Sequence, residues 1–183
     1  MGYKFQINNQ AGVHYLTFTI VKWKDLFNSE NFRNIIIENL NQCQTSKSLS
    51  IMSFVIMPNH LHLIAQSKND SLSKTIGSFK QFTAKKIIAV LKSEMSQEAN
   101  EILHAFAQQA ATHSRNSHYQ VWQQNNHPIE IFSNKFLFQK MKYIHNNPVK
   151  AGLVKSATDY PFSSARNYSG LEGAMEITVV RSL

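Results

Sequence analysis

The chain of 183 residues contains one cysteine, Cys43. A single thiol cannot form a disulfide within the chain, so we expect a protein of a reducing compartment. The first residues lack the apolar core of a secretory signal peptide, and no apolar run is long enough to span a bilayer. We therefore expect a cytoplasmic protein without a membrane partner.

Acidic residues are also scarce. The chain has 11 Asp and Glu against 19 Lys and Arg, which gives a formal net charge of +8 at pH 7. An excess of positive charge at this size favours a polyanionic partner, and nucleic acid before a membrane surface. Because we find no repeat and no low-complexity linker, we expect one domain over residues 1–183 with a substantial hydrophobic core.

The apolar pattern predicts an α+β fold. Strands are expected at residues 13–21, 50–57 and 60–66, and helices at 31–44 and 71–91. A fourth strand is expected at 119–123, and residues 94–116 are expected to be an insertion with a short helix at 98–109. The order βαββαβ is that of a ferredoxin-like antiparallel sheet, with helices on one face and the other face left for a site.

His60-Leu61-His62 follows the largely apolar residues 51–57 and a turn at Pro58-Asn59. In a strand, side chains two residues apart leave the same face, so both imidazoles should project to one side and Leu61 to the other. Two imidazoles on one face can bind a single metal ion. Half-buried histidines bonded to their neighbours would show the same pattern, so this motif alone does not decide between the two interpretations.

A late helix is predicted at residues 133–147, and Pro148 should end it. Tyr143 and Asn147 lie four residues apart and share one face of this helix, roughly a third of a turn from its apolar stripe. A phenol and an amide are thus displayed side by side. The apolar stripe consists of Leu137, Met141 and Ile144.

Together, these segments resemble a known family. A His-hydrophobic-His strand followed by one tyrosine on a late helix is similar to the single-tyrosine HUH (IS200-like) transposases. The flanking sequences resemble the REP-associated tyrosine transposase branch of that family, and the resemblance runs from about Tyr15 to Tyr168. These sequences are MPNHLHLI at 57–64, VWQ at 121–123, YIHNNPVKAG at 143–152 and YPFSS at 160–164.

The resemblance implies a ferredoxin-like fold and a role for four residues. His60, His62 and Asn147 would bind one divalent ion, and Tyr143 would be the nucleophile. Other branches of the superfamily carry Gln where Asn147 stands. Imidazole ligands favour manganese or zinc over magnesium on intrinsic affinity, and cellular abundance leaves Mg²⁺ or Mn²⁺ as the expected ion.

The reaction implied by the resemblance is cleavage and rejoining of single-stranded DNA that carries hairpins (REP-like elements). Attack by the tyrosine on phosphorus gives a 5′-phosphotyrosine and a free 3′-hydroxyl, and the bond energy kept in this intermediate removes the need for a nucleotide cofactor. Lys80, Lys140 and Lys142 are candidate phosphate contacts, although Lys140 and Lys142 could be ordinary solvated lysines. Lys80 lies at the edge of the apolar stripe of its helix. Trp122 could stack an unpaired base or belong to the core.

Two other functions are compatible with parts of the sequence. A catalytically silent DNA-binding protein of the same fold would keep the basic surface, but the intact candidate site argues against it. A zinc hydrolase could use the histidine pair, but no Glu or Asp lies near the motif as a general base. The sequence leaves both a monomer and a homodimer open.

Overall fold

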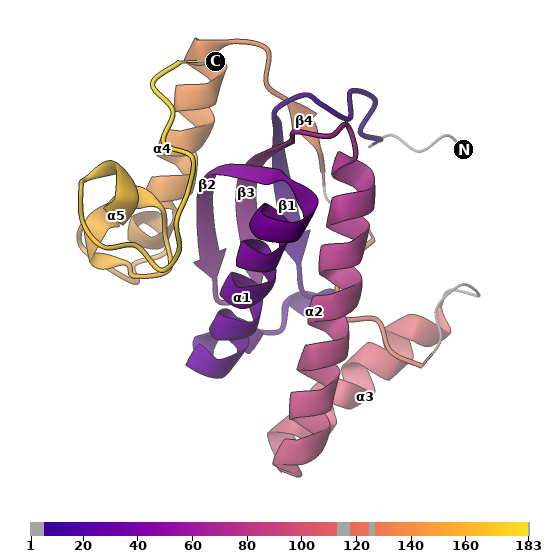
Figure 1. Cartoon of the computed structure of the whole chain (residues 1–183). Coiled ribbons are helices and arrows are strands. Elements are labelled where there is room, and N and C mark those ends of the chain that lie inside the picture. Colours follow the sequence, from indigo (N-terminus) through magenta and orange to yellow (C-terminus); the bar gives the residue numbers. More distant parts are fainter. Residues whose placement is uncertain (1–5, 113–117, 125–126, 183) are drawn as a thin grey trace.

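The fold is a four-stranded antiparallel sheet with helices on both faces. The computed structural model describes residues 6–112, 118–124 and 127–182 (Figure 1). In space the strand order is β2-β3-β1-β4, and every neighbouring pair is antiparallel. This is the predicted ferredoxin-like order, with α1 after β1 and α2 after β3. The strands are β1 (His14–Thr19), β2 (Leu49–Met57), β3 (His60–Ser67) and β4 (Ile129–Glu130).

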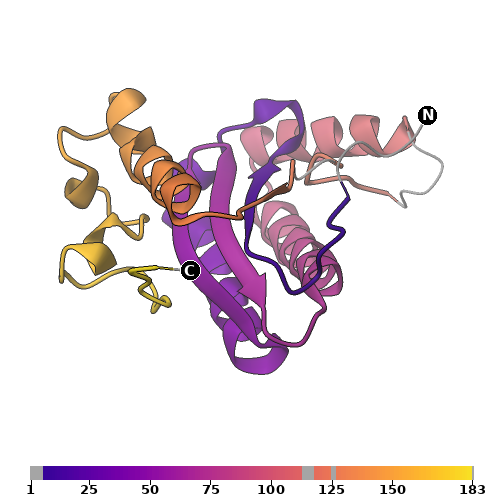
Figure 2. The ribbon, with the colours of Figure 1, turned by 90° about the horizontal axis from the view of Figure 1, so that it is seen from above.

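The two faces of the sheet are covered by different helices. α1 (Glu30–Lys47) and α2 (Leu72–Glu94) pack on one face, where alternate strand residues such as Phe18 and Leu61 are buried. α4 (Asn134–Lys150) packs on the other face, against β2 and β3 (Figure 2). The predicted apolar stripe of α4 is confirmed, because Leu137, Met141 and Ile144 are all buried there.

The predicted turn between β2 and β3 is confirmed. Met57 pairs with His60, so Pro58 and Asn59 alone connect the two strands. This short connection fixes the register of the hairpin. Leu61 and Leu63 consequently join the α1–α2 core, whereas His62 and Ile64 face α4.

The predicted fourth strand at residues 119–123 is wrong. That segment makes only an isolated bridge between Ile20 and Trp122, and the strand beside β1 is the two-residue β4. The physical reason is the side chain of Trp122, whose indole N–H donates to the Thr83 hydroxyl at 3.0 Å. This hydrogen bond holds the segment in the core beside the end of β1. Rings packed against Trp122 are those of Phe18, Phe27 and Phe79.

The end of α4 also differs from the prediction. The helix includes Pro148 and continues to Lys150. A proline lacks the N–H that would bond four residues back, but it lies in the last turn, where its carbonyl accepts from Leu153 at 2.9 Å. Gly152, at φ +70°, follows the helix in the left-handed conformation that favours glycine. Asn147 therefore keeps regular helical register with Tyr143.

The free edge of β2 is covered by the C-terminal part of the chain. Phe162 accepts a backbone hydrogen bond from Ile56, and Ser164 donates one to Phe54. The Tyr160 hydroxyl donates to the Ile56 carbonyl at 2.8 Å. The segment YPFSS thus covers the edge of β2, which would otherwise be exposed. The sequence pattern did not predict this role. The short elements here are η3 (Ala157–Asp159) and α5 (Ala165–Tyr168).

α3 (Gln97–Ala111) follows α2 and packs against it. It is slightly longer than the helix predicted at 98–109, and Ile102 and Phe106 bury its apolar face. Whether residues 94–116 are an insertion stays a prediction, and residues 113–116 lie outside the described part. Two short helices precede α1: η1 (Val21–Trp23) and η2 (Leu26–Asn28). None of the described helices combines the length and apolar character of a membrane span.

The packing of α4 can be tested at neighbouring positions. Leu137→Ala should lower the free energy of unfolding by about 2–5 kcal/mol, because it leaves a cavity under a fully buried side chain. Phe138→Ala is the matched control, and since that side chain is exposed it should cost about 1 kcal/mol or less. Denaturant titration measures both. Equal losses would contradict the assigned orientation of α4.

Candidate functional site

The candidate site lies on the face of the sheet that α4 covers in part. His60 and His62 project to this face, and their ring centroids are 4.6 Å apart at an interplanar angle of 73°. Thr17 of β1 pairs with His62, and Thr19 pairs with His60. The predicted common side of the two imidazoles is therefore confirmed, as is the opposite orientation of Leu61.

His62 is held by two hydroxyl groups from β1. The Tyr15 hydroxyl lies 2.8 Å and the Thr17 hydroxyl 2.9 Å from its Nδ1 atom. These contacts leave Nε2 available as a ligand atom. Burial, then the nearby His60 and Lys140, lower the pKa of His62 to about 3. The ring is thus neutral at physiological pH, which is the form that binds metals.

His60 is oriented through a chain of two hydrogen bonds. The Asn59 Nδ2 atom donates to an Asp25 carboxylate oxygen at 2.7 Å, and Asn59 Oδ1 lies 2.7 Å from Nδ1 of His60. A carboxylate can only accept, so it turns the amide oxygen of Asn59 toward the ring. Nδ1 of His60 must then carry the proton and donate it. The lone pair stays on Nε2, and burial lowers the pKa of His60.

Tyr143 of α4 completes a row of rings with the histidine pair. Its ring centroid lies 5.4 Å from that of His62 and 6.3 Å from that of Tyr15, both in edge-to-face contact. The side chain of Tyr143 is 42% exposed, whereas Tyr15 is 6% exposed. Tyr143 therefore presents its ring both to the histidines and to solvent.

Two lysines place positive charge beside these tyrosines. The Lys140 ammonium lies 4.5 Å from the Tyr15 ring centroid and 5.8 Å from that of Tyr143. The Lys150 ammonium lies 5.5 Å from the Tyr143 ring centroid. Lys150 was missed by the sequence analysis, although it is seven residues after Tyr143 and so shares its face. Lys142 is exposed on α4.

Asn147 lies one helical turn after Tyr143. Its amide Nδ2 atom is buried and has no hydrogen-bond partner among the described residues, which is unusual for a polar group. Because the two ends of an amide are interchangeable by rotation, this position can equally hold a ligand oxygen. No three His, Cys, Asp or Glu side chains gather anywhere in the described part of the chain. The role of Asn147 as the third metal ligand stays a prediction, which this unpartnered amide supports.

Besides Lys150, four residues at the site were not predicted. Tyr15 and Thr17 could have been found, because the alternation of residues 13–21 places them on the face opposite the core. The pair Asn59 and Asp25 depends on the approach of η2 to the β2–β3 turn, where the Phe27 amide donates to the Pro58 carbonyl. No sequence spacing indicates that contact. It also brings a carboxylate near His60, contrary to the expectation that none lies there.

Two predicted DNA contacts are placed inside the protein. Trp122 is 4% exposed and is not accessible to a base. Lys80 is partly buried on α2, and its ammonium donates to the Gln123 carbonyl at 2.8 Å. Both residues hold the segment after α3 against α2. Phosphate binding by Lys80 stays a prediction.

Comparison with known protein families identifies the family of this chain. The profile of the family described as "Transposase IS200 like" matches residues 9–147. The chain belongs to the IS200-like transposase family. The matched region of this IS200-like transposase includes the histidine strand and ends at Asn147, so it contains every candidate ligand and Tyr143.

One solved structure shows the same fold. A REP-associated tyrosine transposase bound to a REP hairpin superposes with a TM-score of 0.61 at 20% sequence identity, covering 100% of this chain and 96% of the other. A Deinococcus radiodurans protein provisionally described as a transposase has 14% identity and a TM-score of 0.39, over 80% and 95% of the two chains. No curated protein sequence matches the chain.

The buried state of Lys80 has a measurable consequence. Burial lowers its pKa to about 8, from 10.5 in an exposed lysine. Between these values the unfolded chain binds more protons than the folded one, so the contribution of Lys80 makes the free energy of unfolding rise with pH. Lys80→Met should remove this rise, measured by denaturant titration from pH 7.5 to 10.5. The exposed Lys74→Met is the control, and an unchanged slope in Lys80→Met would contradict the burial.

Proposed function

We propose that this protein is a metal-dependent transposase that cleaves and rejoins single-stranded DNA bearing hairpins. The observation that carries the proposal is the row formed by His60, His62 and Tyr143, which combines two neutral imidazoles with an exposed phenol. Membership of the IS200-like family supports DNA processing. The REP hairpin bound by the structurally similar transposase supports a hairpin as the recognised element.

The residues present fit a divalent ion. His60 and His62 would supply their Nε2 atoms, and the unpartnered amide of Asn147 would supply an oxygen after rotation. Mg²⁺ or Mn²⁺ bound there would act as a Lewis acid on a phosphate oxygen. The hydrogen bonds at both Nδ1 atoms hold the two rings in place, and the amide oxygen of Asn59 selects for His60 the tautomer whose Nε2 can bind a metal.

Tyr143 is the proposed nucleophile, and Tyr15 is a second phenol beside His62 in the described part of the chain. The Tyr15 hydroxyl is buried against His62, and burial raises its pKa to about 12. Tyr15 is therefore a poor source of phenolate and is inaccessible to a DNA strand. Tyr143 is exposed, and the ammonium groups of Lys140 and Lys150 stabilise negative charge that develops on its oxygen.

The proposed reaction balances without a further reactant. The Tyr143 oxygen attacks phosphorus after losing its proton to solvent, the bond from phosphorus to the 3′ oxygen breaks, and that oxygen takes up a proton. The product is a 5′-phosphotyrosine and a free 3′-hydroxyl. Attack by another 3′-hydroxyl on the same phosphorus reverses these changes, releases Tyr143 and joins the strands.

The metal proposal predicts an effect of a residue that is not a ligand. Asn59→Ala removes the amide that orients His60, and without this hydrogen bond Mn²⁺ binding should weaken roughly 10–100-fold. Isothermal titration of the DNA-free protein with Mn²⁺ measures this. Asn41→Ala, on α1 at the opposite face of the sheet, is the matched control. If neither wild type nor Asn41→Ala binds Mn²⁺, the metal site is wrong.

The nucleophile is tested by Tyr143→Phe. This change should abolish covalent attachment to short hairpin oligonucleotides in Mn²⁺ or Mg²⁺, because it removes the attacking oxygen. The free energy of unfolding should change by about 1 kcal/mol or less, since the Tyr143 side chain is 42% exposed. Gel detection of protein–DNA adducts gives the readout.

Tyr119→Phe is the control for this experiment and should form the adduct like the wild type. A wild-type amount of adduct in Tyr143→Phe would refute Tyr143 as the nucleophile. If the wild type binds hairpins but forms no adduct with any of them, the silent DNA-binding protein becomes the better interpretation.

A further inference from the structure

Trp23 is an unusually exposed aromatic residue at the edge of the site. Its side chain is 60% exposed, whereas Trp122, the other tryptophan of the chain, is buried. The backbone at Lys22 and Trp23 has φ values of 53° and 54°, in the left-handed region that residues other than glycine seldom occupy. Strained backbone of this kind concentrates at functional sites. Here it turns a large apolar ring outward instead of into the core.

The position of Trp23 connects it with the proposed reaction centre. Its ring centroid lies 6.3 Å from that of His60, in edge-to-face contact. The rings of Trp23, His60, His62 and Tyr143 thus follow one another, with neighbouring centroids 6.3, 4.6 and 5.4 Å apart. A phosphate held at the histidines would have Tyr143 on one side and Trp23 on the other.

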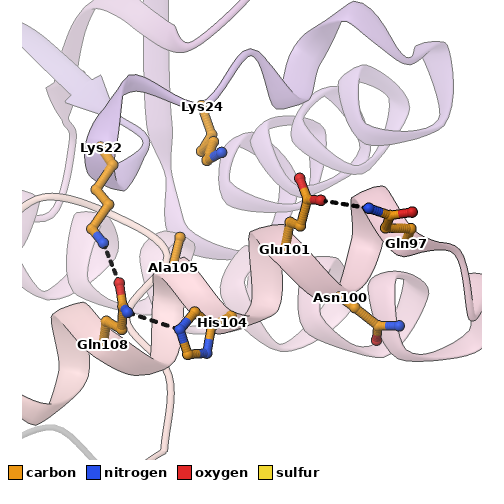
Figure 3. A pocket seen from close by; sticks show the side chains of 8 residues that line it. All are labelled: Lys22, Lys24, Gln97, Asn100, Glu101, His104, Ala105 and Gln108. Atoms are coloured by element: carbon orange, nitrogen blue, oxygen red, sulfur yellow. Dashed lines mark hydrogen bonds between the residues drawn. The ribbon is translucent and has the colours of Figure 1, made fainter.

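Positive charge accompanies the exposed indole. Lys22 and Lys24 flank Trp23 in the sequence and line one wall of an open cavity of about 790 Å³, with α3 as the other wall (Figure 3). The Lys22 ammonium donates to Gln108 of α3 at 2.5 Å. Glu101 also lines the cavity on the side of α3 and would repel phosphates. The sugar–phosphate backbone of a bound strand should therefore follow the wall formed by the two lysines. An aromatic ring beside lysines is the combination that binds single-stranded nucleic acids.

We propose that Trp23 is a stacking platform for an unpaired base of the DNA strand, next to the phosphate held at His60 and His62. Lys22 and Lys24 would bind the phosphates that follow this base toward α3. This inference rests on the proposed function, because it places a nucleotide beside the proposed reaction centre. It adds a binding site outside the four residues implied by the family motifs.

The test uses the full-length protein and a single-stranded dT12 oligonucleotide. Stacking on the exposed indole should quench tryptophan fluorescence, since Trp122 is shielded in the core. Trp23→Ala should weaken dT12 binding roughly 5- to 150-fold, the range that corresponds to one stacked base. Trp23→Phe should restore most of the affinity, because stacking needs only an aromatic face.

Phe82→Ala is the matched control for exposure. Phe82 is 52% exposed and lies on α2, which covers the opposite face of the sheet, so its removal should leave dT12 affinity unchanged. The double variant Lys22→Gln, Lys24→Gln should lower the slope of log K against log salt by about 0.7 for each phosphate that a lysine no longer neutralises. Thermal unfolding of every variant establishes that the fold is intact.

The outcomes separate this inference from the proposed function. If the wild type forms the covalent adduct but Trp23→Ala binds and cleaves as well as the wild type, the stacking platform is wrong and the proposed function stands. If the wild type neither binds dT12 nor forms an adduct with hairpins, both are wrong. If the fluorescence of Trp23 is quenched when the protein concentration rises in the absence of DNA, the ring belongs to an interface between copies of the chain and the stacking platform is wrong.

Discussion

The antiparallel pairing of β1 with β3 determines the arrangement of the site. Thr17 lies opposite His62, and the hydroxyls of Thr17 and Tyr15 both reach its Nδ1 atom. A slip of one residue would turn both imidazoles into the α1–α2 core and expose Leu61 to the other face. The hydrophobic pattern of two strands therefore fixes the position of the two polar rings. The two-residue turn at Pro58 and Asn59 excludes most alternative registers of the hairpin.

α4 makes the second face of the sheet a site as well as a packing surface. Its apolar stripe is buried against β2, while Tyr143, one residue away from Ile144, stays at the border with solvent. The position of the site at this border meets two opposing requirements of the proposed reaction. Burial keeps the imidazoles neutral and the surrounding dielectric low, whereas a nucleophile must be reached by a DNA strand. One helix meets both needs because neighbouring residues on it point about 100° apart.

Much of the fold could be predicted from the sequence, because alternation and helical periodicity are properties of single segments. The histidine strand, its turn and the stripe of α4 belong to this class. The segment at 119–123 was assigned wrongly because a short apolar run looks the same whether it pairs or only fills the core, and Trp122 decides for the core. Contacts between distant segments, such as Asp25 with Asn59, leave no local pattern. Trp23 was missed for the same reason: only the folded chain places it beside His60.

The two tyrosines near His62 show how surroundings assign different roles to one residue type. The Tyr15 hydroxyl is enclosed and bonded to an imidazole, and burial raises its pKa to about 12, so it orients the ring and stays protonated. Tyr143 is exposed and has the ammonium groups of Lys140 and Lys150 near its ring, so under the proposed mechanism these two groups would stabilise charge that develops on its oxygen. A silent DNA-binding protein would need neither this separation nor the hydrogen-bond chain that orients His60. The different surroundings of the two tyrosines and the hydrogen bonds that orient His60 occur in one site, and together they are the physical argument for the proposed catalytic function.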